Sequence, residues 1–307
     1  MTAQEASARI QNGDRRALAR GASWIEAQSD AGHQLLRLLF PRTGSAKLIG
    51  ITGPPGAGKS TLADQLAKTI RMRAQTVAIL AVDPSSPFTQ GAILGDRIRM
   101  QDHHADPGVF IRSMASRGKM GGLASATLEM ALLLDAAGFD FVLIETVGVG
   151  QGEIEIARLA DVTVLVLVPG MGDDVQAIKA GTMEIADVFA INKSDLPGAE
   201  RLEDEIRMMQ SLGGHDQRRD AAPLRRVVAS QAQGVESLLE VIEQVFAQRS
   251  RESARVDAWQ IRLREMAEER LTAALPEPTL NQHAVRIAAK MEDPYTAVDA
   301  ILADLLK

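Results

Sequence analysis

The sequence predicts an α/β protein with a mainly parallel sheet flanked by helices, preceded by N-terminal helices and followed by a C-terminal helical extension. Between Lys47 and about Ala247, short runs rich in β-branched residues alternate with helix-like segments. Most of these runs are continuously apolar, which is typical of parallel strands covered by helices on both faces. After about Ser250 such runs cease. We therefore expect an N-terminal helical segment at 1–45, a sheet domain at 46–250 and an extension at 251–307.

The N-terminal segment predicts helices. The stretches "RRALARGASWIEAQ" and "AGHQLLRLLF" are amphipathic at helical spacing, and Pro41 and Gly44 follow them as stop signals. This segment has no strand-like run, so it is expected to add helices to the domain behind it.

The sheet domain predicts seven strands. In chain order they are "KLIGIT", "TVAILAVD", "VFIRSMA", "FDFVLIET", "VTVLVLVP", "VFAINKSD" and "RRVVAS". In such sheets, ligands bind beyond the carboxyl ends of the strands. Glu145 ends the fourth run, and so points to that edge as a functional site.

The extension predicts a long amphipathic helix, "ESARVDAWQIRLREMAEERLTAAL", that ends before "PEP" and is followed by two shorter helices. Val256, Trp259, Leu263 and Met266 recur at helical spacing. Such a tail either packs back on its domain or pairs with a second copy. Since no strand remains to cover the stripe, we expect a homodimer formed through this extension.

Composition narrows the function class. The chain of 307 residues has a net charge of −6, which does not favour nucleic-acid binding. It contains no cysteine, so disulfides and zinc–thiolate sites are absent. The start has no secretory signal pattern, and the longest apolar runs are shorter than a membrane span. The sequence therefore favours a soluble cytoplasmic or organelle-matrix protein, the cytoplasm being the expected location, with no membrane or nucleic-acid partner.

The segment "GPPGAGKS" between the first run and the helix-like "STLADQLAKTI" matches G-x-x-x-x-G-K-[ST]. Backbone N–H groups of such a loop cradle phosphate oxygens, and the following helix end adds favourable partial charge. Lys59 is expected to reach the terminal phosphates, and the Ser60 hydroxyl to ligate Mg²⁺. The motif makes the predicted fold that of a P-loop nucleoside triphosphatase. Its nucleotide-binding residues are Gly53, Pro55, Gly56, Ala57, Gly58, Lys59, Ser60 and Thr61.

The segment "NKSD" stands at the end of the sixth run. The Asp195 carboxylate can accept two hydrogen bonds from the ring N–H and the 2-amino group of guanine, a donor pair that adenine lacks. Asn192 can bond the base edge and hold the loop, while the Lys193 stem packs on the base plane. A solvated turn is the alternative, but the preceding phosphate loop favours binding of GTP and GDP.

The segment "ETVG" resembles the D-x-x-G segment of G proteins, with Glu145 in place of Asp. In that segment the acid bonds Mg²⁺ or its water, and the glycine N–H, here of Gly148, bonds the γ-phosphate and moves when it leaves. The alternative is an acid that caps a loop at a strand end.

Two further acids belong to this edge by position. Asp83 ends the second run, and Asp96 lies in "GAILGDRIRM". Either could join the magnesium shell or orient a water, although acids are also common in surface loops. Arg117 and Lys119, in "SRGKMGG", fit a phosphate-sensing segment or an ordinary basic loop.

Together these motifs resemble the MeaB/ArgK group of P-loop GTPases, whose human relative is the methylmalonic aciduria type A protein. The resemblance is carried by "GITGPPGAGKSTL", "LAVDPSSPFTQGAILGDRIRM", "IRSMASRGKMGGLA", "VLIETVGVGQGE", "LVPGMGDDVQAIKAGTMEIAD" and "INKSD". It covers most of residues 47 to 197.

The resemblance implies a GTPase chaperone that escorts an adenosylcobalamin-dependent acyl-CoA mutase and gates cofactor loading from an adenosyltransferase. It also implies a homodimer paired through the C-terminal extension. In the family's pattern Lys59, Asp83, Asp96 and Glu145 are catalytic, and Ser60 joins the three acids as magnesium ligands. Asp173 and Lys179 occupy positions that would couple the nucleotide state to the mutase. An ordinary loop and helix start is the alternative for that segment.

Two segments depart from the family's usual sequence pattern. The second guanine-binding motif, usually S-A, reads "VASQ" at Val228 to Gln231, so Ala229 and Ser230 are its candidate residues. The sequence of the helical stretch "RALARGASWIEAQ" also differs from the one usual in the family.

Rival functions from other classes are a small-molecule kinase, with Asp83 as base, and a nickel-delivery GTPase. The absence of cysteine and the five scattered histidines disfavour metal delivery. A purely structural partner is disfavoured by the intact Lys59, Ser60 and acids.

Overall fold

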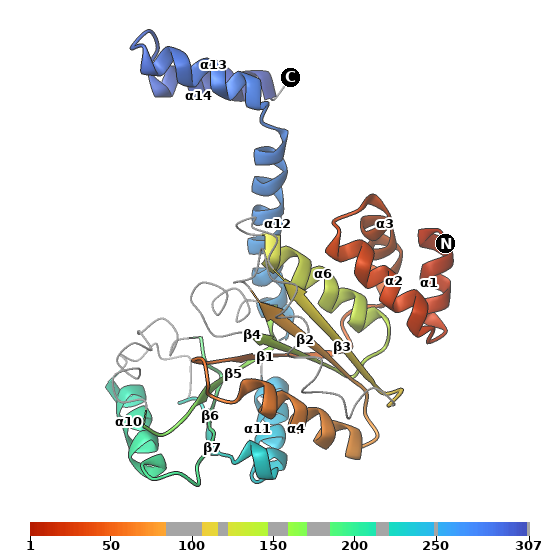
Figure 1. The fold of residues 1–307 in the computed structure, drawn as a ribbon, viewed down its shortest axis with the longest axis vertical. Helices are drawn as coiled ribbons and strands as arrows, with labels where there is room; N and C mark the ends of the chain where they lie inside the picture. Colours follow the sequence, from red (N-terminus) through yellow and green to blue (C-terminus); the bar gives the residue numbers. More distant parts are fainter. Residues whose placement is uncertain are drawn as a thin grey trace. The chain divides into compact units, whose positions relative to one another are not determined.

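The computed structural model describes residues 1–83, 106–115, 122–146, 159–170, 185–212, 221–248 and 251–305. The chain divides into two compact units, Met1–Ser250 and Arg251–Lys307. The N-terminal helices thus belong to the same compact unit as the sheet. Figure 1 colours the chain along its length and labels the elements of both units.

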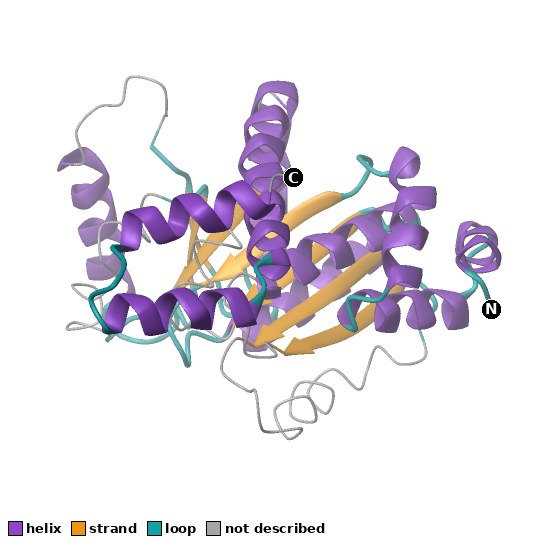
Figure 2. Cartoon of the chain, turned by 90° about the horizontal axis from the view of Figure 1, so that it is seen from above, coloured by secondary structure: helices purple, strands orange, loops and turns teal. Residues whose placement is uncertain are grey.

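The first unit is built on one seven-stranded sheet in the order β3-β2-β4-β1-β5-β6-β7. All its strand pairs are parallel, and the arrows point the same way (Figure 2). The parallel sheet predicted from the apolar runs is confirmed. The strands are β1 Lys47–Thr52, β2 Val77–Asp83, β3 Val109–Ala115, β4 Phe141–Thr146, β5 Val162–Leu167, β6 Val188–Ile191 and β7 Leu224–Arg226.

Strand β1 lies at the centre of the sheet, between β4 and β5. The chain builds β2, β3 and β4 on one side of β1, and then crosses to build β5, β6 and β7 on the other. The strand order therefore switches direction at β1. In open α/β sheets, ligands bind at the carboxyl ends of the strands at such a switch point. The first loop after β1 accordingly lies where a ligand is expected.

Helices cover both faces of the sheet because every strand in its centre is apolar on both sides. On one face, α4 (Lys59–Met72) and α11 (Val235–Gln248) share a buried core with alternate residues of β1, β2, β4, β5 and β6. On the other face, α6 (Gly122–Ala136) packs on β2 and β4, and α10 (Ala199–Leu212) packs on β5 and β6.

The N-terminal helices extend the core on the α6 face. They are α1 (Ala3–Gln11), α2 (Arg15–Glu26) and α3 (Asp30–Leu39). Each begins at a side-chain cap, from Thr2, Asp14 and Ser29 respectively, which satisfies backbone N–H groups of the first turn. Helix α3 ends just before Pro41, which lies in a short 3₁₀ turn, as the stop signal predicted.

Aspartates at the amino edge of the sheet hold the strands in register. Asp161 accepts the Leu48 N–H at 2.9 Å, Asp187 accepts the Thr163 N–H at 2.8 Å, and Asp140 accepts the Thr76 N–H at 2.7 Å. Each carboxylate thus satisfies a backbone donor at or just before the start of a neighbouring strand. These contacts fix the relative height of β1, β2, β4, β5 and β6, and so the height of their carboxyl ends.

The second unit contains the three predicted helices, α12 (Arg251–Ala274), α13 (Glu277–Ala288) and α14 (Pro294–Leu305). In the connection between α13 and α14, the Oε2 atom of Glu292 lies 2.8 Å from His283 Nδ1 and 3.5 Å from Arg286 Nε. Several large apolar side chains of this unit are exposed, namely Val256, Leu263, Leu271, Val285, Met291, Tyr295, Val298 and Leu302. Among the helices that the structure describes, none combines the length and the hydropathy that a bilayer crossing requires.

Candidate nucleotide-binding site

The candidate site begins at the loop between β1 and α4, at the carboxyl edge of the sheet. Gly58 ends this loop in the left-handed region, with φ of 84°, and serves as the N-cap of α4. The first turn of α4 then carries Lys59, Ser60 and the exposed Thr61. Pro55 and Gly56 form the exposed tip of the loop, whereas Ala57 is buried. The sequence motif therefore occupies the strand–loop–helix arrangement that phosphate binding requires.

Lys59 folds back over its own loop. Its ammonium donates to the carbonyl of Gly53 at 2.7 Å and to that of Pro54 at 3.0 Å, and the residue is 6% exposed. A buried ammonium needs such acceptors, because burying a charge without hydrogen bonds is costly. These contacts keep the positive charge inside the phosphate loop.

Ser60 meets Glu145 across the edge of the sheet. Strand β4 pairs with β1, with Glu145 opposite Ile51, so the end of β4 delivers Glu145 beside the first turn of α4. The Ser60 hydroxyl donates to Glu145 Oε1 at 2.5 Å, and Glu145 is 6% exposed. A hydroxyl and a carboxylate are the hard oxygen ligands that Mg²⁺ prefers, so this pair fits a magnesium site.

The other acids expected here are described only in part. Asp83 is the last residue of β2, the neighbour of β4, and only its backbone is described. Asp96 and Gly148 lie outside the described residues. In the described part of the chain, no three His, Cys, Asp or Glu side chains gather as metal ligands. The Ser60–Glu145 pair is thus the part of the acidic site whose geometry is described.

Asn192 joins the loop after β6 to the phosphate loop. Its side-chain nitrogen donates to the Ala57 carbonyl at 2.8 Å, and its side-chain oxygen accepts the Ala229 N–H at 3.0 Å. The residue is 3% exposed. A Cβ on Gly58 would overlap the Asn192 side-chain nitrogen, so only glycine allows this close approach. Asn192 therefore holds the loop after β6 against the phosphate loop.

Lys193 and Asp195 follow on the same loop. Lys193 has a positive φ of 53° and donates from Nζ to the Gly56 carbonyl at 3.0 Å. Ser194 donates its N–H to the Val227 carbonyl at 3.1 Å, which ties the loop to the end of β7. Asp195 is exposed. The loop is thus anchored on both sides, and Asp195 on this loop remains exposed.

Ala229 and Ser230 lie in a 3₁₀ turn, Ala229–Gln231, that follows β7. Ala229 is buried and its N–H is held by Asn192, whereas Ser230 is exposed. A bridge between Val228 and Gln233 closes the turn. The structure therefore brings this turn, "NKSD" and the phosphate loop together at one edge, although they are far apart in the sequence.

Sequence motifs did not reveal the carbonyl groups that organise this site. The acceptors for Lys59, Lys193 and Asn192 are main-chain oxygens of Gly53, Pro54, Gly56 and Ala57. A motif specifies side chains, so main-chain acceptors carry no signal in it. Asp173 and Lys179, the predicted coupling residues, lie outside the described part of the chain.

Comparison with known proteins identifies the family. A family model for "Methylmalonyl Co-A mutase-associated GTPase MeaB" matches residues 18–279. A putative GTPase of Pyrococcus abyssi is 43% identical over 309 residues, covering 97% of this chain and 95% of that protein. GTPase ArgK of Escherichia coli is 42% identical over 198 residues, covering 63% of this chain and 60% of its own.

A solved structure shares the fold over nearly its full length. It is described as LAO/AO transport system kinase, and it is similar with a TM-score of 0.73 and 26% identity over 99% of this chain and 98% of its own. Together with the family match over most of the sequence, this establishes the fold and the family. The chain belongs to the MeaB family of methylmalonyl-CoA mutase-associated GTPases.

Proposed function

We propose that this GTPase is a chaperone of an adenosylcobalamin-dependent acyl-CoA mutase, and that it couples GTP hydrolysis to cofactor loading, protection or rescue of that enzyme. The family supplies the hydrolase activity. The observation that carries the site assignment is the contact of Asn192 with both Ala57 and Ala229, because it joins a base-side loop to a phosphate loop.

Guanine is recognised by the loops that Asn192 joins. The exposed Asp195 carboxylate is available to accept the ring N–H and the 2-amino group of guanine. The stem of Lys193 lies along the base plane. Ala229 already donates its N–H to Asn192, so Ser230 is the residue of that turn that we expect to contact the base. Adenine offers no donor pair to Asp195 and is excluded.

The phosphates lie against the loop between β1 and α4. The loop N–H groups and the amino end of α4 supply partial positive charge, and Lys59 adds a full charge to the terminal phosphates. Ser60 and Glu145, with Asp83 and Asp96, would hold Mg²⁺, which neutralises developing charge on the phosphate oxygens. Gly148 would donate its N–H to the γ-phosphate and respond to its loss.

The mutase partner is supported by the family description, which names methylmalonyl-CoA mutase. The sequence carries no D-x-H-x-x-G signature for cobalamin, so the cofactor would be bound by the partner and delivered by an adenosyltransferase. Asp173 and Lys179 would carry the coupling. Asp173→Ala and Lys179→Ala should leave nucleotide affinity nearly unchanged while removing the effect of the mutase on hydrolysis. Full stimulation in both variants would contradict this role.

The partner set also includes a second copy of the chain. The exposed apolar side chains of the second unit, on α12, α13, α14 and the connection that carries Met291, form surface that association would bury. We propose that they pair two copies in a homodimer.

A small-molecule kinase is the second candidate, because the structurally similar protein is described as a transport system kinase. A kinase transfers the γ-phosphate to a metabolite, whereas a GTPase transfers it to water. The two are separated by the product: a phosphorylated metabolite supports the kinase, and stoichiometric inorganic phosphate supports the GTPase.

The test is phosphate release from GTP with and without methylmalonyl-CoA mutase. We expect slow release by the chain alone, because Val149 follows Gly148 where a Ras-like switch places a glutamine that orients the attacking water. Adding the mutase should raise the rate. Fast release that the mutase leaves unchanged would contradict the proposal.

A further inference from the structure

The loop that carries Asp195 is held by two consecutive residues at the end of β7. Arg226 is the last residue of that strand, and it lies opposite Ile191, which ends β6 directly before "NKSD". The next residue, Val227, donates its N–H to the Ile191 carbonyl at 2.8 Å, and its own carbonyl accepts the Ser194 N–H at 3.1 Å. These main-chain hydrogen bonds fix the first half of the loop, up to Ser194.

The second half of the loop leads into α10, and the side chain of Arg226 binds that helix. Its Nε donates to Glu203 Oε2 at 2.5 Å, and its Nη1 lies 3.5 Å from Glu200 Oε1. Both acids lie in the first two turns of α10. Asp195 therefore lies between two anchors: the main chain of Val227 holds the loop before it, and the side chain of Arg226 holds the helix after it.

The main chain of Arg226 is fixed by close packing against Gly234, which follows the turn Ala229–Gln231. A Cβ at position 234 would lie 2.4 Å from the Arg226 carbonyl oxygen, and Gly234 has a φ of 74°. Only glycine suits both the close approach and this backbone conformation. Arg226 thus connects α10, through its side chain, with the turn that presents Ser230, through its main chain.

Both carboxylate oxygens of Glu203 are bound by arginines. Oε2 accepts from Arg226, and Oε1 lies 2.5 Å from Nη2 of Arg207, one turn further along α10. Two such contacts fix the orientation of the carboxylate, whose side chain is 13% exposed. Arg226 is 41% exposed, and ion pairs at the surface add little to the free energy of unfolding. Removing this pair should therefore shift the loop without unfolding the domain.

We propose that Arg226 and Glu203 are positioning residues for guanine recognition. The pair sets the end of the loop that carries Asp195 relative to the turn that carries Ser230. This inference rests on the proposed function, in which those two residues contact the base. The Asp195 carboxylate must meet two donors on one edge of guanine, and such a two-pronged contact depends on orientation as well as distance. Displacement of the loop should therefore weaken recognition of the 2-amino group.

Arg207 offers a matched control, because it binds the same carboxylate from within α10. Arg207→Ala removes one arginine from Glu203 and leaves the contact with Arg226 in place. Arg226→Ala also removes one arginine from Glu203, but it breaks the connection between α10 and β7. The comparison therefore separates the loss of a positive charge beside Glu203 from the loss of the connection between the two elements.

The experiment uses inosine diphosphate (IDP), which has the ring N–H and the 6-oxo group of guanine but no 2-amino group. The ratio of GDP affinity to IDP affinity therefore reports how well the Asp195 carboxylate is placed. Arg226→Ala, Glu203→Gln, the double variant and Arg207→Ala are compared in the full chain, well below each melting temperature. Calorimetric titration at saturating Mg²⁺ gives both affinities, and phosphate release at saturating GTP gives kcat. Glu203→Gln keeps the size of the side chain, so it serves if Arg226→Ala folds poorly.

We expect Arg226→Ala and Glu203→Gln to lower GDP affinity about fivefold and the GDP-to-IDP ratio about threefold, which is within the range for one exposed ion pair. Their kcat should stay within about twofold, because the phosphates are bound by another loop. The double variant should bind GDP no more weakly than the weaker single one, because the two residues act as a pair. Arg207→Ala should change the ratio by less than about 1.5-fold. Arg226→Lys, which keeps the charge, should recover part of the ratio.

A GDP-to-IDP ratio in both Arg226→Ala and Glu203→Gln equal to that of the unmodified chain would overturn the inference. An equal fall of the ratio in Arg207→Ala and Arg226→Ala would also overturn it, because the connection between α10 and β7 would then be irrelevant. Either result leaves the proposed function standing, because the unmodified chain still prefers GDP to ADP. An unmodified chain that binds GDP and ADP equally well would overturn both.

Discussion

The side-chain nitrogen of Asn192 lies 2.8 Å from the carbonyl oxygen of Ala57, and this contact joins the base-side loop after β6 to the phosphate loop after β1. The two loops come from strands separated by β5 in the sheet. In the proposed binding mode, one connected structure would therefore hold both the base and the phosphates. Substitutions at Asn192 should therefore weaken the binding of both the base and the phosphates.

We expect Asn192→Ala to weaken GDP binding and to destabilise the protein. The change leaves the Ala57 carbonyl and the Ala229 N–H without Asn192 in a buried setting, at a cost of about 1–3 kcal/mol for each. Asn192→Asp is the matched variant, because it keeps an oxygen for Ala229 and loses the donor to Ala57. Calorimetric GDP titration and thermal unfolding measure both effects. Unchanged GDP affinity in Asn192→Ala would contradict the joining role.

Ser60 and Glu145 should control the dependence of nucleotide binding on Mg²⁺. In Ser60→Ala and Glu145→Gln, we expect added Mg²⁺ to increase GDP affinity much less than in the unmodified chain, because each change removes a hard oxygen ligand or its charge. Ser60→Thr keeps the hydroxyl and should retain most of the response. The measurement is GDP affinity across a Mg²⁺ series with a chelator as the zero point. A full Mg²⁺ response in Ser60→Ala and Glu145→Gln would show that neither residue holds the ion.

Removing the second unit should convert a dimer into a monomer. We expect the full chain to have the mass of two copies in light scattering at micromolar concentration, and a chain ending at Ser250 to have the mass of one. The exposed Val285, Tyr295 and Val298 provide a milder test, since changing them to serine leaves α13 and α14 present. A full-length monomer, or a dimer that survives truncation, would disprove pairing through this unit.

The fold was predictable because its central strands are buried on both faces. Six of the seven runs correspond closely to strands, since residues that are apolar on both sides of a strand are buried between two helical layers, whereas "RRVVAS" overlaps β7 only at Arg225 and Arg226. The bounds of the seventh strand were predicted least accurately. Strand β7 covers only Leu224–Arg226, and the following Val227 and Val228 already belong to the loop at the site. The long helix, its end before "PEP" and the two shorter helices were equally visible, because periodicity and proline are local signals.

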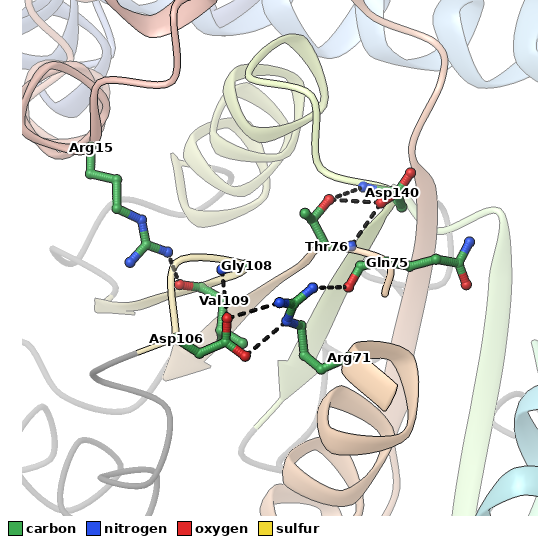
Figure 3. A network of polar contacts seen from close by, with 8 residues as sticks. All are labelled: Arg15, Arg71, Gln75, Thr76, Asp106, Gly108, Val109 and Asp140. Atoms are coloured by element: carbon green, nitrogen blue, oxygen red, sulfur yellow. Dashed lines mark hydrogen bonds and ion pairs between the residues drawn. The ribbon is translucent and has the colours of Figure 1, made fainter. Parts of the chain in front are cut away.

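The site was predictable only where a motif names a side chain. The loop residues Lys59 and Ser60, and the loop carrying Asn192, were identified from sequence, and the structure brings them to one edge. Outside the site, the Arg71–Asp106 ion pair that joins the last turn of α4 to the turn before β3 (Figure 3) was not predictable, because two oppositely charged residues far apart in sequence give no pattern before the register of β2 and β3 is known. The strand-start caps of Asp161 and Asp187 were missed for the same reason.

The central claim, that this edge of the sheet binds guanine nucleotides through Asp195, is tested most directly by the base specificity of Asp195→Asn. Asp195 is exposed, so the change should leave the fold intact. An amide in place of the carboxylate can donate to the 2-oxo group of xanthine, which the carboxylate repels. Competition titrations with GDP, XDP and ADP should show GDP preferred by the unmodified chain and XDP preferred by Asp195→Asn. Equal affinity of the unmodified chain for GDP and ADP, or an unaltered preference in the variant, would contradict the account.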